Sequence, residues 1–220
     1  MKTKLLLAVS LAFPLTMVAQ DDNDYYDATY LRIGAGVSHV EDLEGFVDSA
    51  VAPRLNFDYS FDPGVRVDFA PGLNFNQYFA FELNTGITWN SLDGIEVGGQ
   101  SESADGDLIQ VPILANFIAK VPTQIGLTPF IGAGGGGVYT RLAIGDVNGV
   151  EVDDSGDDFF GAFQLFGGLT FEVTEGCHIG AAYNFMHVFS NDEEFSSNGD
   201  RAGLDDLTTH SITAIVTIDF

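Results

Sequence analysis

The sequence predicts an all-β protein, an eight-stranded antiparallel up-and-down transmembrane β-barrel, and three observations lead to this prediction. Apolar and polar residues alternate with a period of two over several long segments. The connections between those segments alternate between long and short. The acidic residues gather in the long connections and leave one face of each segment almost free of charge. These features together are typical of strands that cross a lipid bilayer.

The segments are long enough for this role. In the first of them, Leu31, Ile33 and Val37 share one face, and Arg32 and Ser38 lie on the other. A tilted β-strand needs only ~9–11 residues to cross a membrane, and each segment exceeds that length. The parity of the fifth segment stays open because it contains the run Gly134–Gly137. The eight expected strands are 28–40, 64–75, 79–91, 107–120, 127–142, 159–173, 176–189 and 207–220.

The acidic residues are concentrated in the long connections. Four long connections, 41–63, 92–106, 143–158 and 190–206, hold 22 of the 32 acidic residues. Three short ones, 76–78, 121–126 and 174–175, lie at the opposite end. A charge on the lipid face near mid-bilayer costs roughly 2–4 kcal/mol, so a lipid-embedded wall requires such sorting. We expect four acidic loops outside the cell and both chain termini in the periplasm.

The first 19 residues are predicted to be a secretory signal peptide. Lys2 and Lys4 form a basic start, and an apolar run from Leu5 to Ala19 follows. That run is shorter than the ~20 residues of a membrane-spanning helix. The sequence then becomes polar at Gln20. We therefore expect a signal peptide at 1–19, a barrel domain at 20–220, and an exported protein.

The composition excludes several kinds of partner and site. The chain has 220 residues, with 8 Lys and Arg against 32 Asp and Glu, and a formal net charge of −24. This balance argues against binding to nucleic acid, because phosphate neutralisation needs clustered Lys or Arg. The single cysteine, Cys177, excludes an internal disulfide and a multi-cysteine metal site.

A soluble lipocalin-like barrel, apolar inside and polar outside, is the alternative architecture. Its outer face would carry many Lys and Glu residues in water. The face opposite the apolar one carries mainly Gly, Ala, Asn, Thr and Ser instead, which suits a narrow lumen packed with small polar groups. An exposed face rich in Trp, Phe and Leu would also aggregate in water, so the pattern favours the membrane.

A network of ions is predicted inside the barrel. The interior of an eight-stranded barrel is just wide enough for side chains to fill it, and unpaired charges there are costly. We therefore expect paired charges that seal the lumen. Tyr30, Trp89 and Tyr183 are among the aromatic residues expected near the strand ends, in girdles at the membrane surfaces. The predicted network consists of Arg32, Arg66, Asp68, Glu82 and Glu172.

Two motifs are weighed as ligand sites. Gly132, Gly134 and Gly137 fit the G-x-G-x-x-G dinucleotide pattern, but strand-like sequence follows where a helix is required. We interpret these glycines as positions where the wall curves around bulky neighbours, and expect no cofactor. Loose binding of divalent cations is the other hypothesis, because carboxylate clusters attract Ca²⁺ and Mg²⁺. Its candidate ligands are Asp153, Asp154, Asp157 and Asp158.

A barrel enzyme that modifies lipid is a further alternative, raised by His187 and Ser190. Their spacing of three places them on opposite faces of a strand, because side chains alternate with a period of two. This geometry does not suit a nucleophile and its base. We expect no catalytic residues.

Several motifs resemble the small outer-membrane β-barrel domain family, the opacity-protein-like porins. They are the runs from Val111 to Asn116 (VPILAN), from Thr128 to Gly134 (TPFIGAG) and from Asn76 to Leu83. The last segment resembles the C-terminal assembly signal of Gram-negative outer-membrane barrels, with Ile212, Ala214, Val216, Ile218 and Phe220 on one face. The resemblance implies an eight-stranded barrel in the outer membrane. It also implies contact with outer-membrane lipids and lipopolysaccharide, and recognition of the last strand by the barrel-assembly machinery.

The expected function is non-enzymatic. We expect a structural role in the envelope, or a surface interaction through the four acidic loops. The alternative is a small passive, porin-like pore for ions or small solutes, and a lipid-modifying barrel enzyme is less favoured.

Overall fold

The computed structural model describes residues 29–49, 52–147, 150–190, 193–194 and 201–220. The predicted signal peptide lies outside the described residues. The strands are β1 (Thr29–Val40), β2 (Leu43–Ser49), β3 (Ala52–Phe61), β4 (Gly64–Asn74), β5 (Phe79–Val97), β6 (Gln100–Lys120), β7 (Leu127–Val147), β8 (Val150–Thr174), β9 (Cys177–Val188), β10 (Glu193–Glu194), β11 (Arg201–Leu204) and β12 (Leu207–Asp219). The described part contains no helix that is long and apolar enough to span a membrane.

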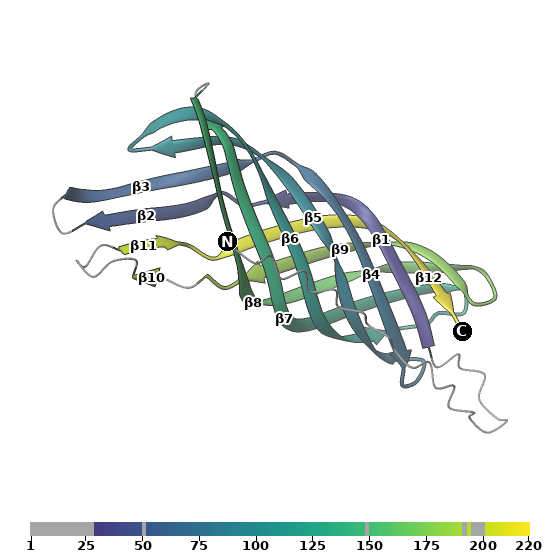
Figure 1. Ribbon diagram of the computed structural model, residues 1–220. Coiled ribbons are helices and arrows are strands. Elements are labelled where there is room, and N and C mark those ends of the chain that lie inside the picture. The colour runs from purple at the N-terminus through teal and green to yellow at the C-terminus, as the bar shows by residue number, and fades with distance from the viewer. Residues whose placement is uncertain (1–28, 50–51, 148–149, 191–192, 195–200) are drawn as a thin grey trace, which may run out of the picture.

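Eight of these strands close into a ring, as predicted. The order is β1, β4, β5, β6, β7, β8, β9 and β12, and the pairing of β1 with β12 completes the circuit. Every pairing between neighbours is antiparallel. Closure removes the unpaired strand edges, so every backbone polar group within the wall can find a partner. Figure 1 shows the strands tilted around the barrel axis.

The two ends of the barrel differ. At one end, here called the turn end, short connections join β4 to β5, β6 to β7 and β8 to β9. At the other, here called the hairpin end, β5 to β8 run on well beyond the ring, and β2 and β3 form a further hairpin beside β5 and β11 (Figure 1). The N-terminus of β1 and the C-terminus of β12 both lie at the turn end.

The prediction of loops at 92–106 and 143–158 is wrong, because the strands continue through most of these residues. β5 and β6 are separated by Gly98 and Gly99 alone, and β7 and β8 by residues 148–149. Gly98 and Gly99 have φ values of 59° and 84°. Two consecutive positive φ values produce the tight turn whose twist matches paired strands, and glycine adopts them without strain. The turn therefore lets pairing persist to the tip of the hairpin.

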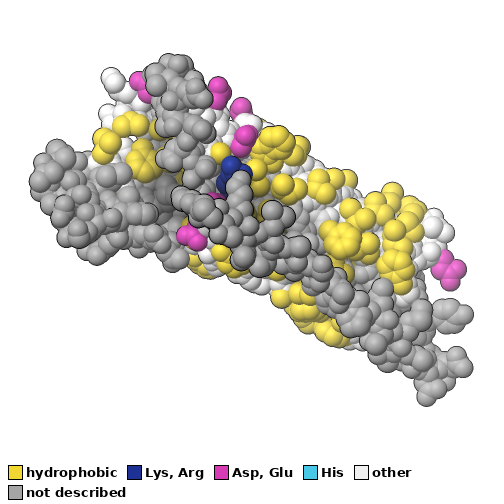
Figure 2. All heavy atoms as spheres, in the orientation of Figure 1, with side chains coloured by type: hydrophobic (Ala, Val, Ile, Leu, Met, Phe, Trp, Pro, Cys, Tyr) yellow, Lys and Arg dark blue, Asp and Glu magenta, His cyan; other side chains and the backbone are white. Residues whose placement is uncertain are grey.

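The outer wall is apolar over its middle. Val37 is 60% exposed, Ile131 69% and Ile212 60%, and each projects outward. Figure 2 shows hydrophobic side chains along the outer wall, with Asp and Glu side chains toward its ends. Residues that face inward on the same strands, such as Arg32 and Ser211, are buried. The residues that alternate in the sequence thus lie on two faces, an apolar exterior and an interior filled with side chains.

Interior glycines make room for large side chains. A Cβ on Gly72 would lie 2.2 Å from the ring of Tyr30, and one on Gly132 would lie 2.3 Å from the ring of Phe166. Even-numbered residues of β7 therefore face inward, which settles the parity that the sequence left open. Tyr30, expected in a membrane-surface girdle, is instead 6% exposed inside the barrel, because Gly72 opens space for its ring.

Candidate functional site

The lumen is the most elaborate polar site in the described part of the chain. Its centre is crossed by amide and hydroxyl side chains that bond to one another across the barrel. Gln164 Nε2 donates to Asn116 Oδ1 over 2.8 Å, and Thr209 Oγ1 donates to Gln110 Oε1 over 2.9 Å. These four side chains are at most 1% exposed. The layer therefore ties distant strands together and fills the cross-section.

Arg32 and Glu82 form a buried ion pair beside this layer. The Arg32 guanidinium contacts the Glu82 carboxylate, and Tyr30 donates its hydroxyl hydrogen to Glu82 over 2.9 Å. Arg32 is 5% exposed and Glu82 1%. The guanidinium also lies over the rings of Phe166 and Phe130, at 5.1 and 5.9 Å from their centroids. Charge, hydrogen bonds and aromatic faces together compensate for the loss of water around both ions.

Arg66 and Asp68 form a second pair in the same lumen. Arg66 Nε lies 3.6 Å from Asp68 Oδ2, and Asn84 donates to the other carboxylate oxygen over 3.1 Å. Arg66 also approaches Ser211 Oγ at 3.4 Å. All of these residues are buried. Four of the five expected network residues therefore lie inside the barrel as two ion pairs.

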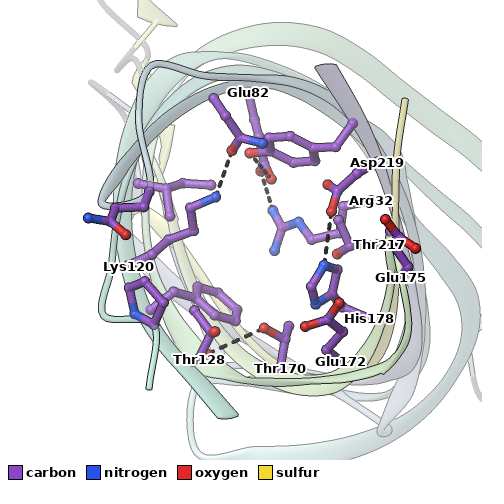
Figure 3. Close-up of a pocket in the computed structure, with 17 residues that line it drawn as sticks. Arg32, Glu82, Lys120, Thr128, Thr170, Glu172, Glu175, His178, Thr217 and Asp219 are labelled. Atoms are coloured by element: carbon purple, nitrogen blue, oxygen red, sulfur yellow. Dashed lines mark hydrogen bonds and ion pairs between the residues drawn. The ribbon is translucent and has the colours of Figure 1, made fainter. Parts of the chain in front are cut away.

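Glu172 does not join these pairs. It is exposed near the turn end of β8, because its strand position lies beyond the buried layers of the lumen. There it lines a polar vestibule of about 420 Å³ that is open at the turn end (Figure 3). The same vestibule contains the His178–Asp219 contact of 2.9 Å and the hydrogen bond from Lys120 Nζ to Asn74 Oδ1. Arg32 and Glu82 belong to its inner lining, so the vestibule ends at the buried ion pair.

The hairpin end of the lumen contains a large apolar cluster, which the sequence analysis missed. Leu108, Val138 and Met186 are 0–1% exposed and belong to one buried cluster with residues of the β2–β3 region. The expectation of a lumen lined by small polar groups is therefore wrong for this end. The signal was present, since Leu108 and Leu114 occupy the inward positions of β6 along with Gln110 and Asn116. The polar layer is thus sealed beneath an apolar plug.

A second polar group lies on the outer wall at the hairpin end. His210 Nε2 donates to Glu41 Oε1 over 2.9 Å, and His210 Nδ1 lies 2.7 Å from the Tyr183 hydroxyl. His187 lies 3.1 Å from Asp206 and 3.2 Å from Thr208 through its two ring nitrogens. The hydrogen bond from His210 holds the pKa of Glu41 below its usual value. Sequence reasoning missed these contacts because they join residues far apart in the chain.

The candidate cation ligands are only partly described. The side chains of Asp153 and Asp154 lie outside the described residues. Asp158 accepts a hydrogen bond from the backbone N–H of Phe159, and the Tyr139 hydroxyl hydrogen-bonds to the Asp157 carboxylate. No group of three or more potential ligands is assembled among the described residues. Divalent-cation binding therefore remains a prediction.

A comparison with protein-family models decides the family. The model of the outer membrane protein beta-barrel domain matches residues 5–220. The chain belongs to this family. Membership identifies an outer-membrane barrel in contact with membrane lipid, in agreement with the resemblance seen in the sequence. A comparison with curated proteins found no match.

Solved structures show the same fold as this outer-membrane barrel. The Neisserial surface protein A has 14% identity and a TM-score of 0.51, with 87% of this chain and 97% of that chain covered. The outer membrane protein OprG from Pseudomonas aeruginosa has 14% identity and a TM-score of 0.55, with 88% and 97% covered. At this identity the likeness concerns the fold alone.

Proposed function

We propose that this outer-membrane barrel is non-enzymatic and acts through its acidic hairpin end, which faces the outside of the cell. Its role is to support the envelope or to offer a surface to a cationic partner. The observation that carries the proposal is the filled lumen. Asn90, Gln110, Asn116 and Met186 are 0% exposed across it. Because these side chains fill the cross-section in the described part of the chain, the external surface is where this protein can act.

The hairpin end carries the charge that such a surface needs. Strands β2, β3, β5 and β6 enclose a hollow of about 420 Å³, and its described lining includes six carboxylates and no basic side chain. A concentrated negative surface attracts cations and speeds their encounter. The carboxylates are Asp42, Glu44, Asp58, Asp93, Glu96 and Glu102.

Neutralising part of this hollow is expected to weaken binding of an oligolysine peptide. In the variant Asp93→Asn/Glu96→Gln, we expect affinity to fall about tenfold, because exposed charge pairs contribute at most ~1 kcal/mol each. The measurement is titration of the peptide onto the barrel in lipid nanodiscs at low and high salt. The variant Glu172→Gln/Glu175→Gln makes the same change in net charge at the turn end and should bind like the wild type. Equal weakening in both variants would contradict a role of the hairpin end.

Export and assembly complete the proposal. We assign export to the signal peptide at 1–19, and recognition by the assembly machinery to the last strand. The exposed outward face of β12 supports this assignment, since Ile212, Val216, Ile218 and the terminal Phe220 all project from the wall.

The contacts of His187 support a structural rather than a catalytic role. Asp206 contacts the His187 ring and also accepts a hydrogen bond from the backbone N–H of Ser190 over 2.8 Å. One carboxylate thus joins the end of β9 to the start of β12. The arrangement ties the chain leaving β9 to the barrel wall.

A passive pore is the second candidate, and one observation favours it. Thr88 Oγ1, Gln110 Nε2 and Asn116 Nδ2 are buried in the polar layer without a hydrogen-bond partner in the described part of the chain. Such groups normally bond to protein or ordered water. A hydrated polar layer would be one segment of a conducting path, which the apolar plug at the hairpin end interrupts.

The folded protein is therefore expected to be electrically silent in planar lipid bilayers. The plug of Leu108, Val138 and Met186 excludes hydrated ions from the end of the lumen. The measurement is single-channel recording on protein whose folding is shown by a shift in gel mobility between unboiled and boiled samples. Boiled protein serves as the control. Steady unitary conductance that appears only with the folded sample would establish the pore in place of the closed barrel.

A further inference from the structure

A groove crosses the lipid-facing wall over β6, β7, β8 and β9. Its volume is about 770 Å³, and none of the described residues that line it is charged. Its position is outside the lumen, on the face that hydrocarbon covers in a membrane. The lining includes Phe117, Ala133, Leu165, Gly167, Tyr183 and Phe185.

Small residues at outward positions create the hollow. Ala119, Ala133 and Gly167 present almost no side chain to the exterior, and they lie between larger neighbours. Among these neighbours, Ile131 is 69% exposed and Leu165 50%. The register pairs Ala133 with Phe117 on one side and with Leu165 on the other. The wall is therefore low at Ala133 on β7 and higher at Phe117 and Leu165 on either side.

The groove leads to the polar group on the outer wall. The register continues from Leu165 to Phe185, from Phe185 to His210, and from His210 to His39. Because the strands tilt, this row climbs from the lower part of β7 to the hairpin end of β1. Tyr183 belongs to both features, since its ring lines the groove and its hydroxyl lies 2.7 Å from His210.

The two features together match an amphiphile. The groove offers an apolar bed, and the contact between His210 and Glu41 offers hydrogen-bonding groups at the membrane surface. An unfilled hollow would forfeit dispersion contacts along its lining. A flexible hydrocarbon chain fits a narrow hollow with raised flanks, whereas a second barrel presents a convex wall.

We propose that this groove is a binding site for one acyl chain of an outer-leaflet lipid, whose polar head lies beside Tyr183, His210 and Glu41. The assignment to the outer leaflet rests on the proposed orientation of the hairpin end. The binding of the chain itself depends only on the groove and the lipid-facing wall.

The test is native mass spectrometry of the barrel purified in mild detergent from its outer membrane. We expect one lipid to remain bound to the wild type and to Ala214→Phe, a matched control that adds the same bulk to the exposed wall of β12. In Ala133→Phe the ring fills the groove, and the ratio of bound to free barrel should fall about tenfold, which corresponds to losing about two buried methylene groups. Ala133→Leu provides a second variant should the larger ring impair folding, and gel mobility reports folding in each case.

Three results would overturn the proposal. The first is retention of the lipid by folded Ala133→Phe and Ala133→Leu, and the second is the absence of a bound lipid from the wild type. The third is a wild-type dimer that Ala133→Phe dissociates, because the groove would then be an interface between two copies. The lipid's mass shows whether it carries a lipid A or a glycerophospholipid head, and a glycerophospholipid would contradict the outer-leaflet assignment while leaving the acyl-chain site in place. None of these readouts depends on oligolysine binding or on conductance, so failure here is distinguishable from failure of the proposed function.

Discussion

Replacing Glu82 with leucine is expected to lower the free energy of unfolding by about 3–5 kcal/mol, because it leaves a buried guanidinium without its counter-charge. Arg32 is 5% exposed and has Glu82 as its carboxylate partner, and Tyr30 loses its acceptor in the same variant. The measurement is a urea titration in lipid vesicles, followed by the shift in gel mobility. We therefore expect Glu82 to stabilise the part of the lumen next to the turn-end vestibule.

Two controls separate lost pairing from lost packing. Glu172→Leu makes the same substitution at an exposed vestibule position, and we expect a change within ~1 kcal/mol. Combining Glu82→Leu with Arg32→Met removes both charges and should recover much of the loss, since apolar replacement of a buried pair is often tolerated. A Glu82→Leu variant as stable as Glu172→Leu would show that the pair adds little to stability.

Placing a positive charge on the lipid-facing wall is expected to have the second large effect. Val67 projects outward near the middle of β4 and is 48% exposed. Val67→Arg should cost roughly 2–4 kcal/mol in the same titration, because the guanidinium would lie in hydrocarbon. No water is available at this depth to solvate the positive charge.

Val97 provides the matched control. It is 36% exposed, but it ends β5 at the tip of an extended hairpin, beyond the ring. Val97→Arg makes the same chemical change in water and should alter stability by less than ~1 kcal/mol. Equal costs at the two positions would mean that the assumed depth of the wall in the membrane is incorrect.

The sequence was sufficient to predict the wall of the barrel. The alternation of Leu31, Ile33 and Val37 with Arg32 and Ser38 is a local property of one strand, and burial on one face follows from it directly. The starts and ends of the strands at the turn end agree closely with the structure for the same reason.

The interior needed information that no single strand contains. The alternation that turns Arg32 inward also turns Tyr30 inward, but the room for the Tyr30 ring depends on the absence of a side chain at Gly72, a residue on another strand. The pairing of Arg32 with Glu82 rather than with Asp68 depends on the stagger between strands. The apolar plug was missed because it is assembled from inward residues of several strands, of which Leu108 and Leu114 on β6 are only two.

The extension of β5 to β8 beyond the ring has a consequence for recognition. β8 has 25 residues, against the ~9–11 required to cross the bilayer. A partner that touches these ribbons meets a backbone already fixed by its own ladder of hydrogen bonds. The backbone of these strands therefore has little conformational entropy to lose when a partner binds. This favours recognition by a preorganised surface over recognition by a flexible loop.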